Sequence, residues 1–291
     1  MIRKILRWSG IVLGIIAVLL LIAYGVIYGI TAQRINKTYE VAVRSIDIPA
    51  DSATISHGAH LFAIKGCGDC HGANLAGKVF LDDPMIGRLV GANLTSGEGG
   101  VPDWFSDKDW LRAMRHGIDH EGKSLLLMPS YEYARLDDKD MAALIAFCKA
   151  QPPVNSALPP AHIGPMGRIL TAFDQMPLLP AEKVDHGYQQ PAQVVKEVTA
   201  EYGKYLAMSC TGCHYPDLKG GKSPIPGQPP VANITASGHI GKWSVEEFVN
   251  TLRTGTTPEG KQLKNEEMPW KMTAAYTTDE LKALYLYLKS I

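Results

Sequence analysis

The stretch Cys67-Gly-Asp-Cys70-His71 decides how this chain is organised, and it has a second copy in Cys210-Thr-Gly-Cys213-His214. Two cysteines separated by two residues and followed directly by histidine are the pattern of covalent haem attachment. Each thiol adds to a vinyl group of the porphyrin, and the adjacent imidazole reaches the iron as its proximal ligand. The sequence therefore predicts two covalently attached c-type haems, with His71 and His214 as the proximal iron ligands.

A Cys-x-x-Cys pair on its own also fits a redox dithiol or one half of a zinc site. The dithiol needs a βαβ context and zinc needs a second pair of ligands nearby, and neither is visible around these motifs. Four of the five cysteines belong to the two motifs. The fifth, Cys148, shares a helical face with Met141, Leu144 and Ile145, which predicts a small buried apolar residue.

The composition sets the broad class of the protein. The chain has 291 residues, a formal net charge of zero and 46% hydrophobic residues. This length suggests about two domains, and the apolar content suffices for their cores and one membrane segment. A neutral chain offers no basic face to offset phosphate charges, so the composition argues against a nucleic-acid partner.

Residues 11–30 are apolar and uncharged, which is long enough for a helix to span a bilayer. We expect an uncleaved N-terminal transmembrane anchor over residues 1–32, with Tyr24 and Tyr28 near the outer interface. A cleaved signal peptide is the alternative, but the apolar run is longer than usual and no clean Ala-x-Ala site follows. Basic residues flank the run equally on both sides, so their count leaves the orientation open.

The remaining chain divides into two units and a connector. We expect the first unit over residues 51–153, a proline-rich connector over 154–193 and the second unit over 194–291. Proline stiffens such a connector and blocks regular helix. We expect the connector to pack along the units, which would fix the distance between the two haems.

Three helices are expected in the first unit. Ser56 is predicted to cap a helix that leads into the first motif. Ser106 and Asp109 resemble a capping box that opens a middle helix. A last helix is expected over about residues 137–149.

The second unit repeats the first in the same order. The matched features are Ala-Asn-Leu-Thr (92–95) and Ala-Asn-Ile-Thr (232–235), Trp104 and Trp243, Arg115-His-Gly and Arg253-Thr-Gly, and Met128-Pro and Met268-Pro. The offsets between matched positions stay within a few residues of one another. This series indicates an internal duplication of one domain of roughly a hundred residues.

Methionine is the natural ligand for the far face of each iron, because a neutral thioether favours ferrous iron and raises the potential. Met128 and Met268 occupy equivalent places in the two units, and each precedes a proline that biases the methionine towards extended backbone. We predict that they are the distal ligands. The rival methionines are Met85, Met208 and Met272, and a bis-histidine alternative would draw on His57, His60, His116, His120 or His239.

A buried haem also brings two propionates that need hydrogen-bond donors. Indole, amide and guanidinium groups supply such donors. The paired candidates are Asn93, Trp104 and Arg115 in the first unit and Asn233, Trp243 and Arg253 in the second.

Each unit resembles a class I c-type cytochrome domain, with a helix before Cys-x-x-Cys-His, a middle helix, a Met-Pro loop and a closing helix. The series Ala-Asn-Leu-Thr, Trp, Arg-x-x-Arg-His-Gly and Met-Pro-Ser-Tyr in residues 92–131 is similar to the cytochrome subunits of bacterial membrane-bound alcohol, aldehyde and gluconate dehydrogenases. The resemblance implies a mainly α fold, with two tandem class I cytochrome c domains after one N-terminal transmembrane helix. Those subunits usually carry three haems and a different membrane attachment, so the partner enzyme stays open.

The resemblance also implies an electron-transfer protein without catalytic residues. It would carry single electrons in a respiratory chain, from a periplasmic or quinol-linked dehydrogenase to a downstream cytochrome or terminal oxidase. Haem attachment in such families implies that the haem domains face the periplasm, outside the bacterial inner membrane. The alternative is a dihaem redox enzyme, a peroxidase or thiosulfate-oxidising cytochrome, with one open or differently ligated iron.

Overall fold

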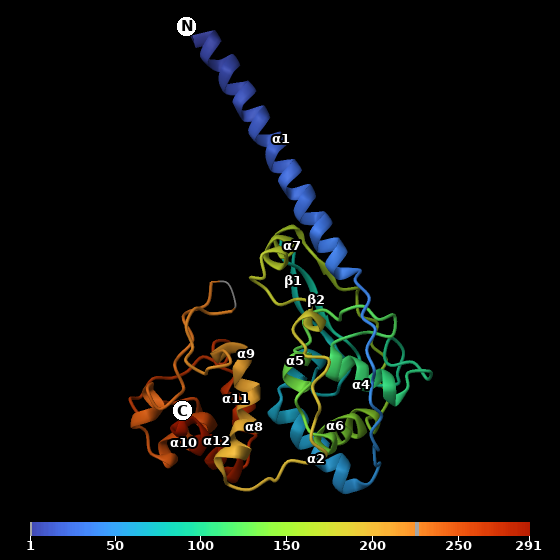
Figure 1. Cartoon of the computed structure of the whole chain (residues 1–291), viewed down its shortest axis with the longest axis vertical. Coiled ribbons are helices and arrows are strands. Elements are labelled where there is room, and N and C mark those ends of the chain that lie inside the picture. Colours follow the sequence, from blue (N-terminus) through green and yellow to red (C-terminus); the bar gives the residue numbers. More distant parts are fainter. Residues whose placement is uncertain (1, 225–226) are drawn as a thin grey trace.

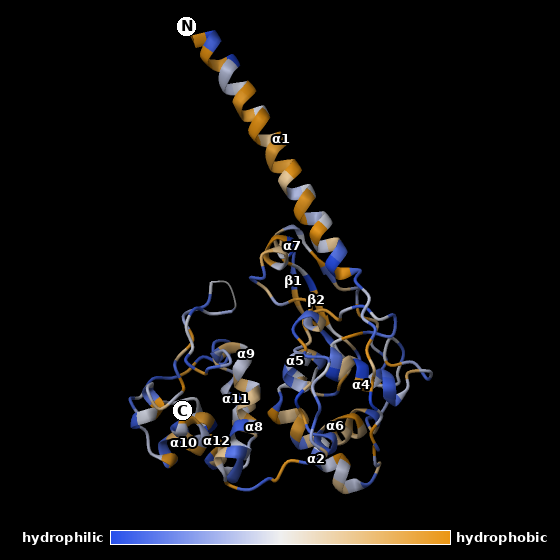
Figure 2. Ribbon diagram, viewed as in Figure 1, coloured by the Kyte–Doolittle hydropathy of each residue, from blue (hydrophilic) through white to orange (hydrophobic). Residues whose placement is uncertain are grey.

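The computed structural model describes residues 2–224 and 227–291. Helix α1 (Ile2–Ile35) projects from a folded body, with its N-terminal end far from every other element (Figure 1). Its ribbon is hydrophobic along most of its length (Figure 2), and the side chains of its apolar part are exposed. The helix is 34 residues long and its most apolar window has a mean hydropathy of 2.9. It is therefore long and apolar enough to cross a membrane.

The folded body is mainly helical, and two groups of elements follow one another along the chain, called here the first and the second unit. The first unit comprises, in order, α2 (Ser52–Ile64), α3 (Cys67–His71), β1 (Lys78–Asp83), β2 (Gly87–Gly91), α4 (Asp107–His116), α5 (Ser130–Tyr133) and α6 (Asp138–Lys149). The second comprises α8 (Ala200–Ala207), η2 (Met208–Cys210), α9 (Thr211–His214), η3 (His239–Lys242), α10 (Val245–Thr254), α11 (Trp270–Thr273) and α12 (Thr278–Ser290). Both units have the same order of helices, as a duplication requires.

The first and last helices of each unit cross at a glycine. An added Cβ at Gly58 in α2 would lie 2.0 Å from the carbonyl oxygen of Ala143 in α6. An added Cβ at Gly203 in α8 would lie 2.0 Å from the carbonyl oxygen of Ala283 in α12. Only glycine permits this close backbone approach. The haem motif of each unit begins three residues after the end of the first of these two crossing helices.

The two units meet through reciprocal contacts. His60 of α2 binds Glu280 of α12 with Nε2–Oε1 at 2.9 Å, and Tyr205 of α8 donates to Asp140 Oδ2 of α6 at 2.7 Å. His60 and Tyr205 each lie two residues after a crossing glycine, while Asp140 and Glu280 each occupy the third position of a last helix. Buried side chains from both units form one continuous core. The contacts make the units a quasi-symmetric pair held in a fixed arrangement.

Residues 38–48 and the connector pack against the first unit. Arg44 forms an ion pair with Asp138 at 2.7 Å. The connector contains β3 (His162–Ile163), α7 (Pro165–Ala172) and η1 (Pro180–Glu182). Strands β1, β2 and β3 form one antiparallel sheet in that order. This hairpin and its third strand have no counterpart in the described part of the second unit, and the glycine-rich sequence did not reveal them.

Three local predictions in the first unit are confirmed and one is wrong. The capping box of Ser106 and Asp109 is present, the last helix begins after Asp137, and Cys148 is buried with 5% of its surface exposed. The predicted cap at Ser56 is wrong. Helix α2 begins at Ser52, because the Asp51 carboxylate accepts hydrogen bonds from the backbone N–H groups of residues 53 and 54.

Candidate haem sites

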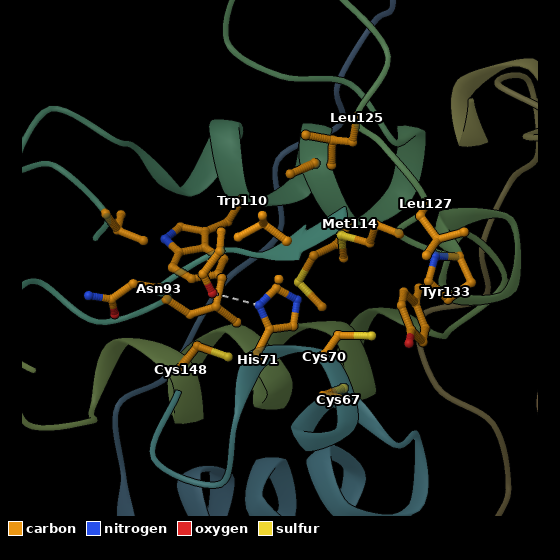
Figure 3. A pocket seen from close by; sticks show the side chains of 18 of the residues that line it. Cys67, Cys70, His71, Asn93, Trp110, Met114, Leu125, Leu127, Tyr133 and Cys148 are labelled. Atoms are coloured by element: carbon orange, nitrogen blue, oxygen red, sulfur yellow. Dashed lines mark hydrogen bonds between the residues drawn. The ribbon is translucent and has the colours of Figure 1, made fainter. Parts of the chain in front are cut away.

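The first motif opens onto a cavity of about 480 Å³ inside the first unit. Its walls come from α3, strand β2, α4, the loop before α5, and α6. Figure 3 shows His71, Cys67 and Cys70 on one side of this space and Trp110, Met114 and Leu125 on the other. The cavity therefore presents two thiols and an imidazole to an apolar enclosure.

The two motif histidines make the same hydrogen bond. His71 Nδ1 lies 2.8 Å from the carbonyl oxygen of Ala92, drawn as a dashed line in Figure 3, and His214 Nδ1 lies 2.8 Å from that of Ala232. A carbonyl oxygen can only accept, so Nδ1 carries the proton and Nε2 keeps its lone pair free. Burial lowers the pKa of both imidazoles, which favours the neutral form that binds metal. Both rings are oriented as an iron ligand requires.

The motif thiols lie in apolar surroundings. Burial raises the pKa of Cys67 to about 12 and that of Cys210 to about 12. A redox dithiol or a thiolate metal ligand works with a lowered thiol pKa, which is the opposite shift. Among residues 2–224 and 227–291, no group of three or more His, Cys, Asp or Glu side chains could hold a metal ion. The donor set of two neutral thiols, one oriented imidazole and an apolar wall fits a covalently attached haem.

The predicted methionine ligands sit on matching turns. The N–H of Ser130 donates to the Met128 carbonyl at 2.7 Å, and the N–H of Trp270 donates to the Met268 carbonyl at 2.6 Å. The intervening prolines have φ −78°, ψ 55° and φ −74°, ψ 64°, which are inverse γ-turns. Met128 also lines the first cavity. These turns give both methionines the same backbone setting, and their role as distal ligands stays a prediction.

Other potential ligands approach the first cavity. Met114, His120 and Met272 belong to its lining. The sequence reasoning weighed His120 and Met272 but overlooked Met114, although its place one turn after Trp110 on an amphipathic helix could have indicated it. Met85 is 52% exposed in the hairpin turn, and Met208 lines a different cavity. The remaining histidine candidates have other neighbours: His57 and His60 bind carboxylates, His116 binds His186, and His239 begins η3.

The predicted propionate donors do not converge on one place. Asn93 lines the cavity, but its amide bonds Thr95 and the Val154 carbonyl within the surrounding loops. Trp104 is 59% exposed and contacts His120 edge-on, and the buried Arg115 binds Asp138 at 2.7 Å outside the cavity lining. In the second unit, Asn233 bonds Ser237 and Thr235, Trp243 donates to Glu259, and Arg253 donates to Thr278. Their propionate role stays a prediction.

One residue from each unit crosses to the other unit's motif. Glu132 lies beside Gly212 of the second motif, since an added Cβ there would be 2.3 Å from Oε1. Met272 Sδ would lie 2.9 Å from a Cβ added at Gly66, next to the first motif. The two residues follow Met128 and Met268 by four positions each, so they are equivalent. Burial raises the pKa of Glu132 to about 7. The sequence did not indicate that these positions are equivalent, because one carries a carboxylate and the other a thioether.

The comparisons with known proteins agree with this geometry. A family model described as Cytochrome c matches residues 55–151 and 200–291. The chain is 30% identical over 227 residues to a nicotinate dehydrogenase component from Pseudomonas putida, covering 70% of this chain and 18% of that protein. It is 27% identical over 277 residues to the cytochrome c subunit of the quinone alcohol dehydrogenase of Gluconobacter oxydans, covering 83% and 55%.

A relative of similar length also matches. A protein named diheme cytochrome c-type from Cereibacter sphaeroides is 28% identical over 273 residues, covering 81% of this chain and 85% of the relative. The chain spans less than two thirds of the length of the other two relatives. The resemblance to cytochrome subunits of dehydrogenases is thereby confirmed.

Proposed function

We propose that this chain, which belongs to the cytochrome c family, holds two haems and passes single electrons between them. The observation that carries the proposal is the meeting of the two motifs. Lys65 Nζ donates to Ser209 Oγ at 2.8 Å, and these residues lie just before Cys67 and Cys210. Electron tunnelling falls steeply with distance, so motifs in contact through their leading residues suit transfer between the two sites.

The residues of the chain divide the work of holding the cofactor. Cys67, Cys70, Cys210 and Cys213 would form the covalent attachments. His71 and His214 would bind from one face through Nε2, and Met128 and Met268 from the other. The bound haem would supply reversible one-electron chemistry. No side chain is required to act as acid, base or nucleophile.

The proposal extends to the membrane and to partners. Helix α1 would anchor the chain in the bacterial inner membrane, with both units facing the periplasm. Relatives named as cytochrome subunits of alcohol, fructose and gluconate dehydrogenases support a dehydrogenase as electron donor. A downstream cytochrome or terminal oxidase would accept the electrons.

Haem content tests the cofactor assignment. The purified full chain is expected to contain two haems in a pyridine haemochrome assay normalised to protein. Replacing Cys67 and Cys70 together with serine should leave one haem, and so should replacing Cys210 and Cys213. Cys148→Ser is the matched control and should retain both. One haem in the unmodified chain would overturn the proposal.

Copurification tests the partner assignment. The chain solubilised from membranes is expected to bring down a dehydrogenase whose substrate reduces both haems. Recovery with a peroxide-reducing activity, together with one iron that lacks a methionine ligand, would favour the dihaem enzyme instead.

A further inference from the structure

Helix α7 of the connector lies beside the end of α1 that enters the folded body (Figure 1). Thr31 of α1 is fully buried and its hydroxyl lies 3.3 Å from the Arg168 carbonyl. The Arg168 guanidinium lies 4.2 Å from the ring centre of Tyr28. Arg34 donates to the Thr171 carbonyl at 2.6 Å and to Glu182 Oε1 at 3.0 Å. These contacts fix α7 against residues 28–34 of α1.

The position of these contacts along α1 gives α7 a defined depth. The uncharged apolar run covers residues 11–30, and at 1.5 Å per residue it spans about 30 Å, the thickness of a hydrocarbon core. Tyr28 and Arg34 then fall at the membrane–water boundary, where tyrosine is favoured and where an arginine near a helix end can extend its guanidinium to water. Because α7 contacts α1 at this level, it lies at the same boundary.

Helix α7 has two different faces. Gly167 and Thr171 are buried, and a Cβ added at Gly167 would lie 2.2 Å from the Ile86 carbonyl of the hairpin. The other face carries Met166, Ile169 and Leu170, and Phe173, the residue directly after α7, continues the spacing i, i+3, i+4 and i+7, so that the four form one stripe. Met166 is 38% exposed and Phe173 is 63% exposed, and Met85 of the adjoining hairpin turn is 52% exposed. We name Met85 and these four residues the α7 stripe.

We propose that the α7 stripe is a second membrane contact, in which α7 lies in the headgroup region of the outer leaflet beside α1. This inference rests on the proposed spanning role of α1. An apolar helical stripe that contacts a spanning helix at the boundary, with arginines at the same level, has the composition of an interfacial membrane contact. The occupant of the stripe is therefore the lipid bilayer and not a protein partner.

The contact has a consequence for the first haem site. The N–H groups of Met166 and Gly167 donate to the Met85 carbonyl, and the Gly164 N–H donates to the Ile86 carbonyl. The hairpin that they bind continues into Val90 and Gly91, which line the first cavity. A rigid path thus runs from the bilayer through α7 and the hairpin to the first haem, and it sets the tilt of that unit above the membrane.

Depth measurement by electron paramagnetic resonance tests the proposal. The haem-loaded full chain would be reconstituted in phosphatidylcholine–phosphatidylglycerol vesicles, with a nitroxide at Phe173→Cys or Met166→Cys. Collision rates with oxygen, which enters lipid, and with a nickel chelate, which stays in water, would then be compared. Leu286→Cys is the matched water-facing control, since Leu286 is 42% exposed on α12. Leu20→Cys reports the spanning segment.

The expected result is an oxygen-to-nickel ratio several-fold higher at Phe173 and Met166 than at Leu286, and highest at Leu20. A lipid-like ratio at Leu20 with water-like ratios at both α7 positions would overturn the α7 contact and leave the anchor standing. Water-like ratios at all positions would overturn the anchor and the α7 contact together. A haem spectrum of each variant that matches that of the unsubstituted chain would show that the fold is retained.

Discussion

The first and second units share a scaffold but embed it differently. In the first unit, Asn93 Nδ2 donates to the Val154 carbonyl of the following segment, whereas in the second, Asn233 Nδ2 donates to nearby Ser237 at 3.1 Å. Arg115 shares Asp138 with Arg44 from the segment after α1, whereas Arg253 donates to Thr278 within its own unit. The matched positions therefore keep the same place in each unit, but their side chains bind different partners. At these positions the first unit binds the segments on either side of it, whereas the second unit binds residues of its own.

Removing the proposed distal ligands should produce the largest effect and tests whether the two sites are equivalent. Met128→Ala and Met268→Ala should each abolish the methionine–iron charge-transfer band of one haem and leave the other. The potential of the affected haem should fall by a few tenths of a volt, within the ~0.8 V that axial ligands span. Visible spectroscopy and redox titration of the purified chain measure both quantities.

Met114→Leu is the matched control for the first site, because Met114 also lines the cavity. It should leave both bands in place. A Met128→Ala spectrum identical to that of the unmodified protein, with loss of the band in Met114→Leu, would transfer the ligand role to Met114.

Much of the scaffold could be predicted because its determinants are local. The Cys-x-x-Cys-His motifs, the box of Ser106 and Asp109 and the face of Cys148 depend on spacings within one or two helical turns. Strand β3 escaped prediction because its partner β2 lies about seventy residues earlier in the chain. The approaches of Glu132 and Met272 to the other unit's motif escaped prediction because they join segments far apart in the chain. Contacts between distant segments leave no periodic trace in the sequence.

The carboxylates at the unit interface should show the next largest effect. Asp140 is 1% exposed and accepts from His57, Lys196 and Tyr205. Asp140→Asn would face these donors with an amide, at a cost of about 3–5 kcal/mol in the free energy of unfolding. Glu280→Gln, at the equivalent and more exposed position, should cost about 2 kcal/mol. Denaturant unfolding followed by circular dichroism measures both.

The same carboxylate predicts that the free energy of unfolding declines at acidic pH. Burial alone would raise the pKa of Asp140, but hydrogen bonding to His57 and the charge of Lys196 hold it well below its usual range. The stabilisation is therefore complete above the unfolded pKa of about 3.9 and is lost as the pH falls below it. Asp140→Asn should remove the share of this decline at acidic pH that comes from Asp140. The exposed pair of Asp107 and Lys149 is the control, and Asp107→Asn should cost about 0–1 kcal/mol.

The glycine crossings test the shared scaffold directly. Gly58→Ala and Gly203→Ala each place a Cβ 2.0 Å from a backbone carbonyl oxygen of the opposing helix. Each should lower the free energy of unfolding by about 1–3 kcal/mol, because neither backbone can yield without separating the helices. Gly14→Ala, with nothing within 4 Å, is the control. A loss of thermal stability in only one of the two variants would contradict the equivalence of the units.

A histidine pair should produce the smallest effect at neutral pH, and one confined to the first unit. His116 is 7% exposed, and its Nδ1 lies 3.0 Å from His186 Nδ1 of the connector, whereas the matching position in the second unit is Thr254. Burial, together with His186 and Arg115, lowers the pKa of His116 to about 4. The unfolded chain takes up this proton near pH 6.5 and the folded chain does not, so stability should decline as the pH falls from about 6.5 to about 4. The decline should reach about 2 kcal/mol by pH 5 and should be absent in His116→Gln, whereas Thr254→Ser should keep it. An equal decline in His116→Gln would place the titrating group elsewhere and would remove this difference between the two units.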